Sequence, residues 1–221
     1  LPSPDTFVQK FKAAKEAGDE VICILIASKL SGTYQGAMLA KQIVDYDGIH
    51  VIDAGHAAAS VAEKMLVIAA CRMRDQGCKA EEIARRLEQL RGSVRLIACL
   101  DTLEYLARGG RLPAAVASIG TKLQLKPIIV FGENGEIQVV KKCMGSKRAM
   151  RDMTEMVTEC RVNPEYPVIP LFAQNDGNCQ EYVASLKNAG CVGMMQAPQG
   201  IGATIGSYIG PGGYGIVFVE K

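Results

Sequence analysis

The stretch VICILIASKLSGTYQ, residues 21–35, decides the fold class and carries the first candidate site. Its first seven residues are all apolar, and such a run is typical of a parallel-sheet strand that is buried on both faces. Residues 31–44 have the spacing of a helix that turns Tyr34, Met38 and Ile43 inward. A strand followed directly by a helix is the repeating unit of a parallel α/β sheet.

The elements around this stretch continue the alternation of helices and strands. Helical spacing occupies residues 6–18 ahead of it. After it, an apolar strand at residues 50–53 leads into helices at residues 55–76 and 79–91. We therefore expect residues 1–93 to form a doubly wound parallel-sheet domain of the α/β class.

Beyond residue 93 the pattern changes, and residues 94–221 read as a second domain. Glu133-Asn134-Gly135 joins two apolar runs and suits the positive-φ positions of a hairpin turn. Strands and helices no longer alternate strictly, so we expect an α+β domain with a mixed or antiparallel sheet. The expected strands are residues 95–100, 127–131, 137–142, 168–174, 192–197 and 214–219, and the expected helices are residues 102–106, 114–123, 146–161 and 178–188.

Charge and hydropathy exclude several classes of protein. The 25 Lys and Arg residues against 23 Asp and Glu give a formal net charge of +2 without a basic stripe, so nucleic acid is not an expected partner. No apolar run reaches the roughly 18 residues that a membrane span needs. The charged residues within positions 1–20 do not fit a signal peptide. We expect a cytoplasmic protein without stable membrane insertion.

The eight cysteines form no C-x-x-C pair, and several stand inside apolar patterns. This distribution indicates buried, reduced thiols that behave as small hydrophobic side chains. The chain has two histidines, His50 and His56, so a zinc site would need cysteines gathered from distant segments. We expect no metal site.

The first candidate site is the turn Ser31-Gly32-Thr33, which follows the carboxyl end of the first strand. Ser31 is a natural N-cap, Gly32 lets a ligand approach the backbone, and the first N–H groups of a helix carry partial positive charge. Ligands of open α/β sheets bind at the carboxyl ends of the strands. We expect an anion here, and an ordinary capped helix is the alternative that the local pattern leaves open.

Two further segments are candidate sites. The glycine-rich residues 200–215 favour turns, helix packing or close approach of the backbone to a ligand, and a purely architectural connection is the alternative. This segment lacks a G-x-x-x-x-G-K-[ST] loop and contains no Lys, so nucleotide phosphates are poorly supported. Residues 101–112 carry Arg108 and Arg111, which either bind an anion or face water.

A catalytic nucleophile finds little support in the sequence. Ser31 is not part of a G-x-S-x-G elbow, and His56, which opens the helix after the neighbouring strand, is the histidine that could reach it. A single histidine at a helix start is more often a cap or a surface group. We therefore expect a site that holds a ligand without transforming it.

Four separated segments match the motifs of one known family. Residues 28–35, SKLSGTYQ, are similar to its S-x-x-L-S-G-T-Y-Q motif, and residues 103–111, LEYLARGGR, to its L-E-Y-L-x-x-G-G-R-I motif. Residues 205–215, IGSYIGPGGYG, are similar to its I-G-T-H-V-G-P-G-A-L-G ending. Residues 126–129 with the hairpin after them add a fourth match. Over nearly its whole length the chain resembles the DegV family of bacterial fatty-acid-binding proteins.

This resemblance implies a non-catalytic carrier that buries one long-chain fatty acid in an apolar tunnel of the second domain. It implies that the Ser31 hydroxyl and the N–H groups of Gly32 and Thr33 hold the carboxylate. The ligand-binding residues that it implies in the C-terminal match are Ser207, Tyr208 and Gly210. The fatty acid is the ligand, and no cofactor is implied.

The chain departs from the family pattern at three places. The family has a further N-terminal segment with a strand and a ligand-contacting Thr, so we expect the first domain to be N-terminally incomplete. Tyr208 stands at the position of a family His, and Ser207 at that of a Thr. Some members present the acid to a fatty-acid kinase, and Met144 replaces an Arg usual on the kinase-facing surface, which weakens the case for that partner.

An alternative from another class is an enzyme subunit related to dihydroxyacetone-kinase folds. It would act on a small polar substrate and would need a polar pocket. Such an enzyme holds its substrate as a hemiaminal on a histidine, and His56 is the candidate near the first site.

Overall fold

The computed structural model describes residues 1–112, 124–191 and 194–221 and divides the chain into two compact units. Unit 1 comprises Leu1–Ala59, Glu63–Gly92 and Glu133–Gly135. Unit 2 comprises Ser60–Ala62, Ser93–Gly132 and Glu136–Lys221. The short segments 60–62 and 133–135 therefore belong to a different unit from the residues that flank them in sequence.

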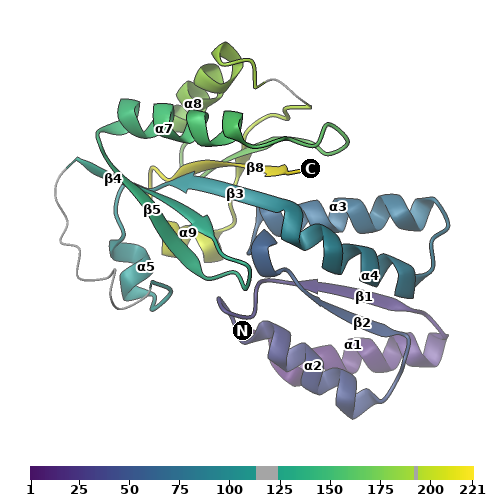
Figure 1. The fold of residues 1–221 in the computed structure, drawn as a ribbon. Coiled ribbons are helices and arrows are strands. Elements are labelled where there is room, and N and C mark those ends of the chain that lie inside the picture. The colour runs from purple at the N-terminus through teal and green to yellow at the C-terminus, as the bar shows by residue number, and fades with distance from the viewer. Residues whose placement is uncertain (113–123, 192–193) are drawn as a thin grey trace. The chain divides into compact units, whose positions relative to one another are not determined.

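Unit 1 has the parallel α/β architecture that the alternating elements predict. β1 (Val21–Leu25) and β2 (Ile49–Asp53) are parallel neighbours in register from Val21 beside Ile49 to Leu25 beside Asp53. Helices cover both faces of this sheet (Figure 1). They are α1 (Pro4–Ala17), α2 (Thr33–Val44), α3 (Val61–Asp75) and α4 (Ala80–Leu90), with the 3-10 helices η1 (Gly55–Ala57) and η2 (Arg91–Ser93).

The buried side of α2 differs from the predicted one. Ile43, predicted to turn inward, is 57% exposed, and Tyr34 and Met38 are half-buried. The residues that α2 buries, at helical spacing, are Thr33, Ala37, Ala40 and Val44. The prediction was wrong because it assigned the larger apolar side chains inward, whereas α2 packs closely against α1 through small alanines.

The single helix predicted at residues 55–76 is interrupted. The 3-10 turn η1 ends at Ala57, and α3 begins at Val61. Between them Ala58 and Ser60 take φ values of +44° and +58°, which no α-helix accommodates. The apolar pattern runs through this break, so the sequence alone does not mark it.

Unit 2 is an α+β unit built on a mixed sheet, as predicted. Its strands, among the described residues, have the order β5-β4-β3-β8-β6-β7. They are β3 (Val94–Cys99), β4 (Leu125–Phe131), β5 (Ile137–Met144), β6 (Ile169–Phe172), β7 (Gln199–Gly200) and β8 (Tyr214–Val219). β4 and β5 form the predicted antiparallel hairpin, and Gly135 in its turn takes φ +83°.

Four helices belong to the described part of unit 2: α5 (Glu104–Arg108), α7 (Ser146–Glu159), α8 (Gly177–Asn188) and α9 (Ala203–Ile209). The glycine-rich C-terminal segment was not predicted to be helical, yet α9 forms there. The strand predicted at residues 192–197 is reduced to a bridge between Val168 and Met195, with β7 following it. Residues 192–193 and the helix predicted at residues 114–123 lie outside the described residues.

The two faces of the larger sheet are both apolar. α7 and α8 cover one face, while α5 and α9 lie toward the other (Figure 1). Under α7 and α8 the core includes Ile97, Ile128 and Phe218, with the Tyr182 and Tyr214 rings 5.6 Å apart. The opposite face carries the buried residues Leu96, Ala98, Ile129 and Val217. Because successive side chains of a strand point to opposite faces, the sheet has two apolar faces, and α7 and α8 pack on one of them.

Gly215 in β8 allows a close approach that any side chain would prevent. A Cβ atom there would lie 2.6 Å from the Ile97 carbonyl oxygen and 2.9 Å from the Ala98 Cβ atom. We expect Gly215→Ala to lower the free energy of unfolding by about 1–3 kcal/mol in urea titrations. The control Gly206→Ala lies in α9 with no atom within 4 Å, so it should be neutral or stabilising by up to about 1 kcal/mol. Equal destabilisation by both variants would contradict the packing argument.

Candidate functional site

The turn between β1 and α2 folds over the carbonyl oxygen of Ala27. This oxygen accepts hydrogen bonds from the backbone N–H groups of Leu30 (2.9 Å) and Ser31 (3.2 Å). As a result α2 begins at Thr33 with Gly32 as its N-cap. The prediction of Ser31 as the N-cap was wrong, because this extra turn delays the helix start by two residues.

Ser31 and Thr33 form a pair of hydroxyls at the helix start. Their oxygens are 2.8 Å apart, and the Ser31 oxygen also accepts from the Thr33 N–H at 3.3 Å. When Thr33 donates to Ser31, the Ser31 hydroxyl is left to donate its own proton outward. The Thr33 side chain is 9% exposed, so its position is fixed by packing. Thr33 therefore holds the Ser31 side chain in one orientation.

The backbone N–H groups of Gly32, Tyr34 and Gln35 have no acceptor within residues 1–112, 124–191 and 194–221. They stand at the positive end of α2, a helix of 12 residues. Together with the Ser31 hydroxyl they offer several donors to one anionic group. These donors stand where the sequence predicts an anion site, and the N–H groups of Tyr34 and Gln35 were not named in that prediction.

Asp53 fixes the position of this turn. Its Oδ1 atom accepts from the backbone N–H groups of Ser28 (3.1 Å) and Gly55 (2.9 Å), so it joins the segments that follow β1 and β2. Arg91 Nη1 donates to the Asp53 carbonyl oxygen at 2.8 Å, and Arg91 Nη2 pairs with Glu88 at 2.7 Å. The negative charge of Asp53 is therefore directed to backbone donors.

The Tyr34 phenol lies close enough to Asp53, Glu88 and Arg91 for their charges to affect its pKa. Burial raises the pKa of its phenol, and the carboxylates of Asp53 and Glu88 raise it further, while Arg91 acts in the opposite direction. The phenol therefore stays protonated around neutral pH and can donate a hydrogen bond.

His56 lies in η1 and is half-buried. In the part of the chain that the structure describes, the hydrogen bonds of the Ser31 side chain are to the hydroxyl and the N–H of Thr33, so Ser31 and His56 do not form a nucleophile–base pair. An activated serine needs a base within about 3 Å of its oxygen.

In unit 2 the structure brings two of the matched motifs together. The Tyr208 ring of α9 packs on Gly109 at the end of α5, and the Tyr105 ring of α5 packs on Gly210 at the end of α9. A Cβ atom would lie 2.3 Å from a ring carbon at either glycine. Both glycines are therefore required for this reciprocal packing. The architectural interpretation of the glycine run applies to Gly210, which is buried and takes φ +78°.

Two of the three predicted ligand residues in this segment, Ser207 and Gly210, donate hydrogen bonds within the segment itself. The Ser207 hydroxyl donates to the Thr204 carbonyl oxygen at 2.8 Å, and the Gly210 N–H donates to Gly206 at 2.8 Å. Ser207 would have to give up that bond to donate to a carboxylate. Tyr208 is half-buried, and its hydroxyl is the stronger candidate donor of the three.

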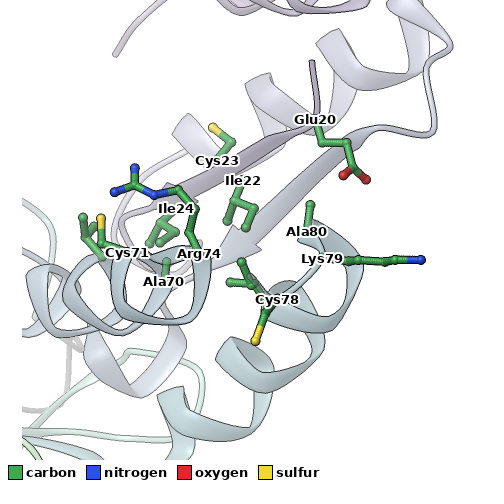
Figure 2. Close-up of a pocket in the computed structure, with 12 residues that line it drawn as sticks. Glu20, Ile22, Cys23, Ile24, Ala70, Cys71, Arg74, Cys78, Lys79 and Ala80 are labelled. Carbon is green, nitrogen blue, oxygen red and sulfur yellow. The ribbon is translucent and has the colours of Figure 1, made fainter. Parts of the chain in front are cut away.

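A groove of about 620 Å³ runs along β1 in unit 1 (Figure 2). β1, α3 and the start of α4 line it, and its side chains include Cys23, Cys71 and Cys78. All five residues of β1 are half-buried, and Ile22, Cys23 and Ile24 line the groove, so the prediction of a strand buried on both faces was wrong. Burial raises the pKa of the Cys23 thiol to about 11, and Glu63 adds to this effect, so the thiol is unreactive near neutral pH.

The residues that line this groove come from residues 20–24, α3 and residues 78–83, and the donors at the start of α2 are not among them.

Two negative findings apply to the described residues. Within them, no helix combines the length and the apolar character that crossing a membrane requires. Nor do three or more His, Cys, Asp or Glu side chains gather there in a group able to hold a metal ion.

Backbone N–H groups and a hydroxyl gathered at one helix start are a candidate site for an anionic ligand in this two-unit α/β fold. A family described as "Uncharacterised protein, DegV family" matches residues 1–221, and the chain belongs to this family. A DegV domain-containing protein of Caldanaerobacter subterraneus subsp. tengcongensis is 34% identical over 99% of this chain and 77% of its own length.

Solved structures of the family share the fold. The chain is similar to a DegV family protein from Thermus thermophilus described by its fatty-acid binding, with TM-score 0.83, 30% identity, and coverage of 100% of this chain and 78% of that one. It is also similar to DegV, a fatty-acid-binding protein from Bacillus subtilis, with TM-score 0.80, 26% identity and coverage of 100% and 78%.

The role of Asp53 in positioning the turn is testable by substitution. Asp53→Ala leaves the N–H groups of Ser28 and Gly55 without their acceptor, so we expect the free energy of unfolding to fall by about 1–3 kcal/mol. Asp53→Asn keeps an acceptor oxygen and should lose less. Chemical denaturation followed by circular dichroism measures both variants. An Ala variant as stable as the Asn variant would contradict this role.

Proposed function

We propose that this protein is a non-catalytic carrier of one long-chain fatty acid, whose carboxylate binds at the start of α2. The observation that carries the proposal is the set of donors at that helix start: the Ser31 hydroxyl and the N–H groups of Gly32, Tyr34 and Gln35. The fatty-acid binding described for the Thermus and Bacillus relatives supports a carboxylate as the anion.

Hydrogen bonding alone would not distinguish a fatty acid from another carboxylic acid. Each buried CH₂ group contributes about 0.8 kcal/mol, so a chain of 14 to 18 carbons supplies most of the affinity. We place the acyl chain within the predicted domain of residues 94–221, whose larger sheet carries apolar residues on both faces. Ser207, Tyr208 and Gly210 stay proposed ligand residues of that domain.

We infer that the protein performs no chemistry on its ligand. Among the described residues, the Ser31 side chain is hydrogen-bonded to Thr33 and not to a base, which supports binding without nucleophilic attack. The alternative of an enzyme related to dihydroxyacetone kinases requires a hemiaminal on His56. Incubation with ¹³C-dihydroxyacetone and a resulting covalent mass shift at His56 would favour that alternative.

A fatty-acid kinase as partner rests on the family resemblance. Met144, at the end of β5, is 63% exposed and occupies the position where the resemblance places an Arg. We propose that the protein acts in the cytoplasm, where its eight unpaired cysteines stay reduced.

The carrier function is tested by native mass spectrometry of the purified protein together with analysis of its solvent extract. We expect one adduct per chain with the mass of a fatty acid of 14 to 18 carbons. If the protein lacks an adduct and also fails to bind added palmitate, it is not a carrier.

The contribution of the helix start is tested by Ser31→Ala. The variant loses a hydrogen bond to a charged group, worth about 1.5–3 kcal/mol, so palmitate should bind about 10- to 150-fold more weakly. Ser28→Ala is the matched control, because the hydrogen bond of Ser28 to Asp53 uses its backbone N–H and survives the substitution. Isothermal titration calorimetry measures both. An unchanged Kd for Ser31→Ala would exclude Ser31 from the site.

A further inference from the structure

The Tyr208 ring is held from two sides by the turn that ends α5. Gly109 leaves room for the ring edge, where a Cβ atom would lie 2.3 Å from Cδ1 and 2.4 Å from Cε1. The guanidinium carbon of Arg111 lies 4.9 Å from the ring centroid, in a cation–π contact. Residues 109–111 and Tyr208 therefore form one packed cluster.

Arg111 is itself fixed within this turn. Its Nη1 donates to the Gly109 carbonyl oxygen at 2.6 Å, and its backbone N–H donates to the Leu106 carbonyl oxygen at 3.0 Å. Gly110 takes φ +68°, a conformation that glycine adopts without strain, and it turns the chain so that Arg111 follows. The guanidinium is thus bonded to the same residue on which the Tyr208 ring packs.

The chemistry of this pair suits an anionic ligand. A guanidinium attracts an anion, and the hydroxyl of a phenol beside it can donate a hydrogen bond to the same group. A ring that packs on a fixed cation and on a glycine presents its hydroxyl in a narrow range of directions. Less rotational freedom is then lost when the hydroxyl binds a ligand.

We propose that Arg111 is a positioning residue for fatty-acid binding, which acts by orienting the Tyr208 phenol. This inference rests on the proposed function and adds a specificity-determining residue to it. Arg108, one turn earlier, is the matched control. It is equally cationic, its side chain is 76% exposed, and it pairs with Glu104 of its own helix.

A double-mutant cycle with palmitate as the probe tests this role. The proteins are wild type, Arg111→Gln, Tyr208→Phe, the double variant, Arg111→Lys and Arg108→Gln. We expect Arg111→Gln to weaken binding about two- to fivefold, the range of an exposed cation–π contact. Arg111→Lys should restore most of the affinity, and Arg108→Gln should leave it unchanged. In the Tyr208→Phe background, Arg111→Gln should have no further effect.

Three other results would contradict this role of Arg111. An equal loss from Arg111→Gln with and without the Tyr208 hydroxyl would show that Arg111 does not act through Tyr208, and no loss at all would remove it from the site. If Arg108→Gln weakened palmitate binding as much as Arg111→Gln does, the loss of affinity would come from the change in net charge and not from the position of Arg111. These results would leave the carrier function intact, whereas a wild-type protein that binds no palmitate would overturn both.

Discussion

The carboxylate of Asp53 is the constraint on which the candidate site depends. It accepts hydrogen bonds from the backbone N–H groups of Ser28, in the segment after β1, and of Gly55, in the segment after β2, and so joins these two segments. The turn over Ala27 then sets the start of α2 at Thr33. Because this turn is fixed, the hydrogen-bond donors at the start of α2 have fixed directions.

In the proposed carrier, the donors at the start of α2 satisfy the carboxylate, whose burial would otherwise cost free energy. These hydrogen bonds orient the ligand, and its hydrocarbon chain supplies most of the affinity. The groove beside β1 offers volume, but the residues that line it do not include the donors at the start of α2.

Much of the fold could be predicted from the sequence, and the errors have local causes. The continuous apolar run before Ser28 predicted a parallel strand correctly, and Asn134-Gly135 predicted its hairpin because few residues tolerate positive φ. The break at Ala58 and Ser60 could not be predicted, since neither residue type signals positive φ. The helix α9 was missed because glycine lowers helix propensity, while tertiary packing of Tyr208 and Tyr105 against glycines stabilises it. At the candidate site the sequence predicted a helix start after the first strand, but the turn over Ala27 moved the N-cap from Ser31 to Gly32.

The most direct test of the account is a titration of ¹⁵N-labelled protein with palmitate and, separately, with hexadecanol, followed by amide chemical shifts. We expect palmitate to shift the amide signals of Gly32, Tyr34 and Gln35 strongly, and hexadecanol, which lacks the carboxylate, to shift them much less. Shifts of equal size with both ligands, or palmitate shifts confined to groove residues such as Cys71 and Ala80, would contradict it.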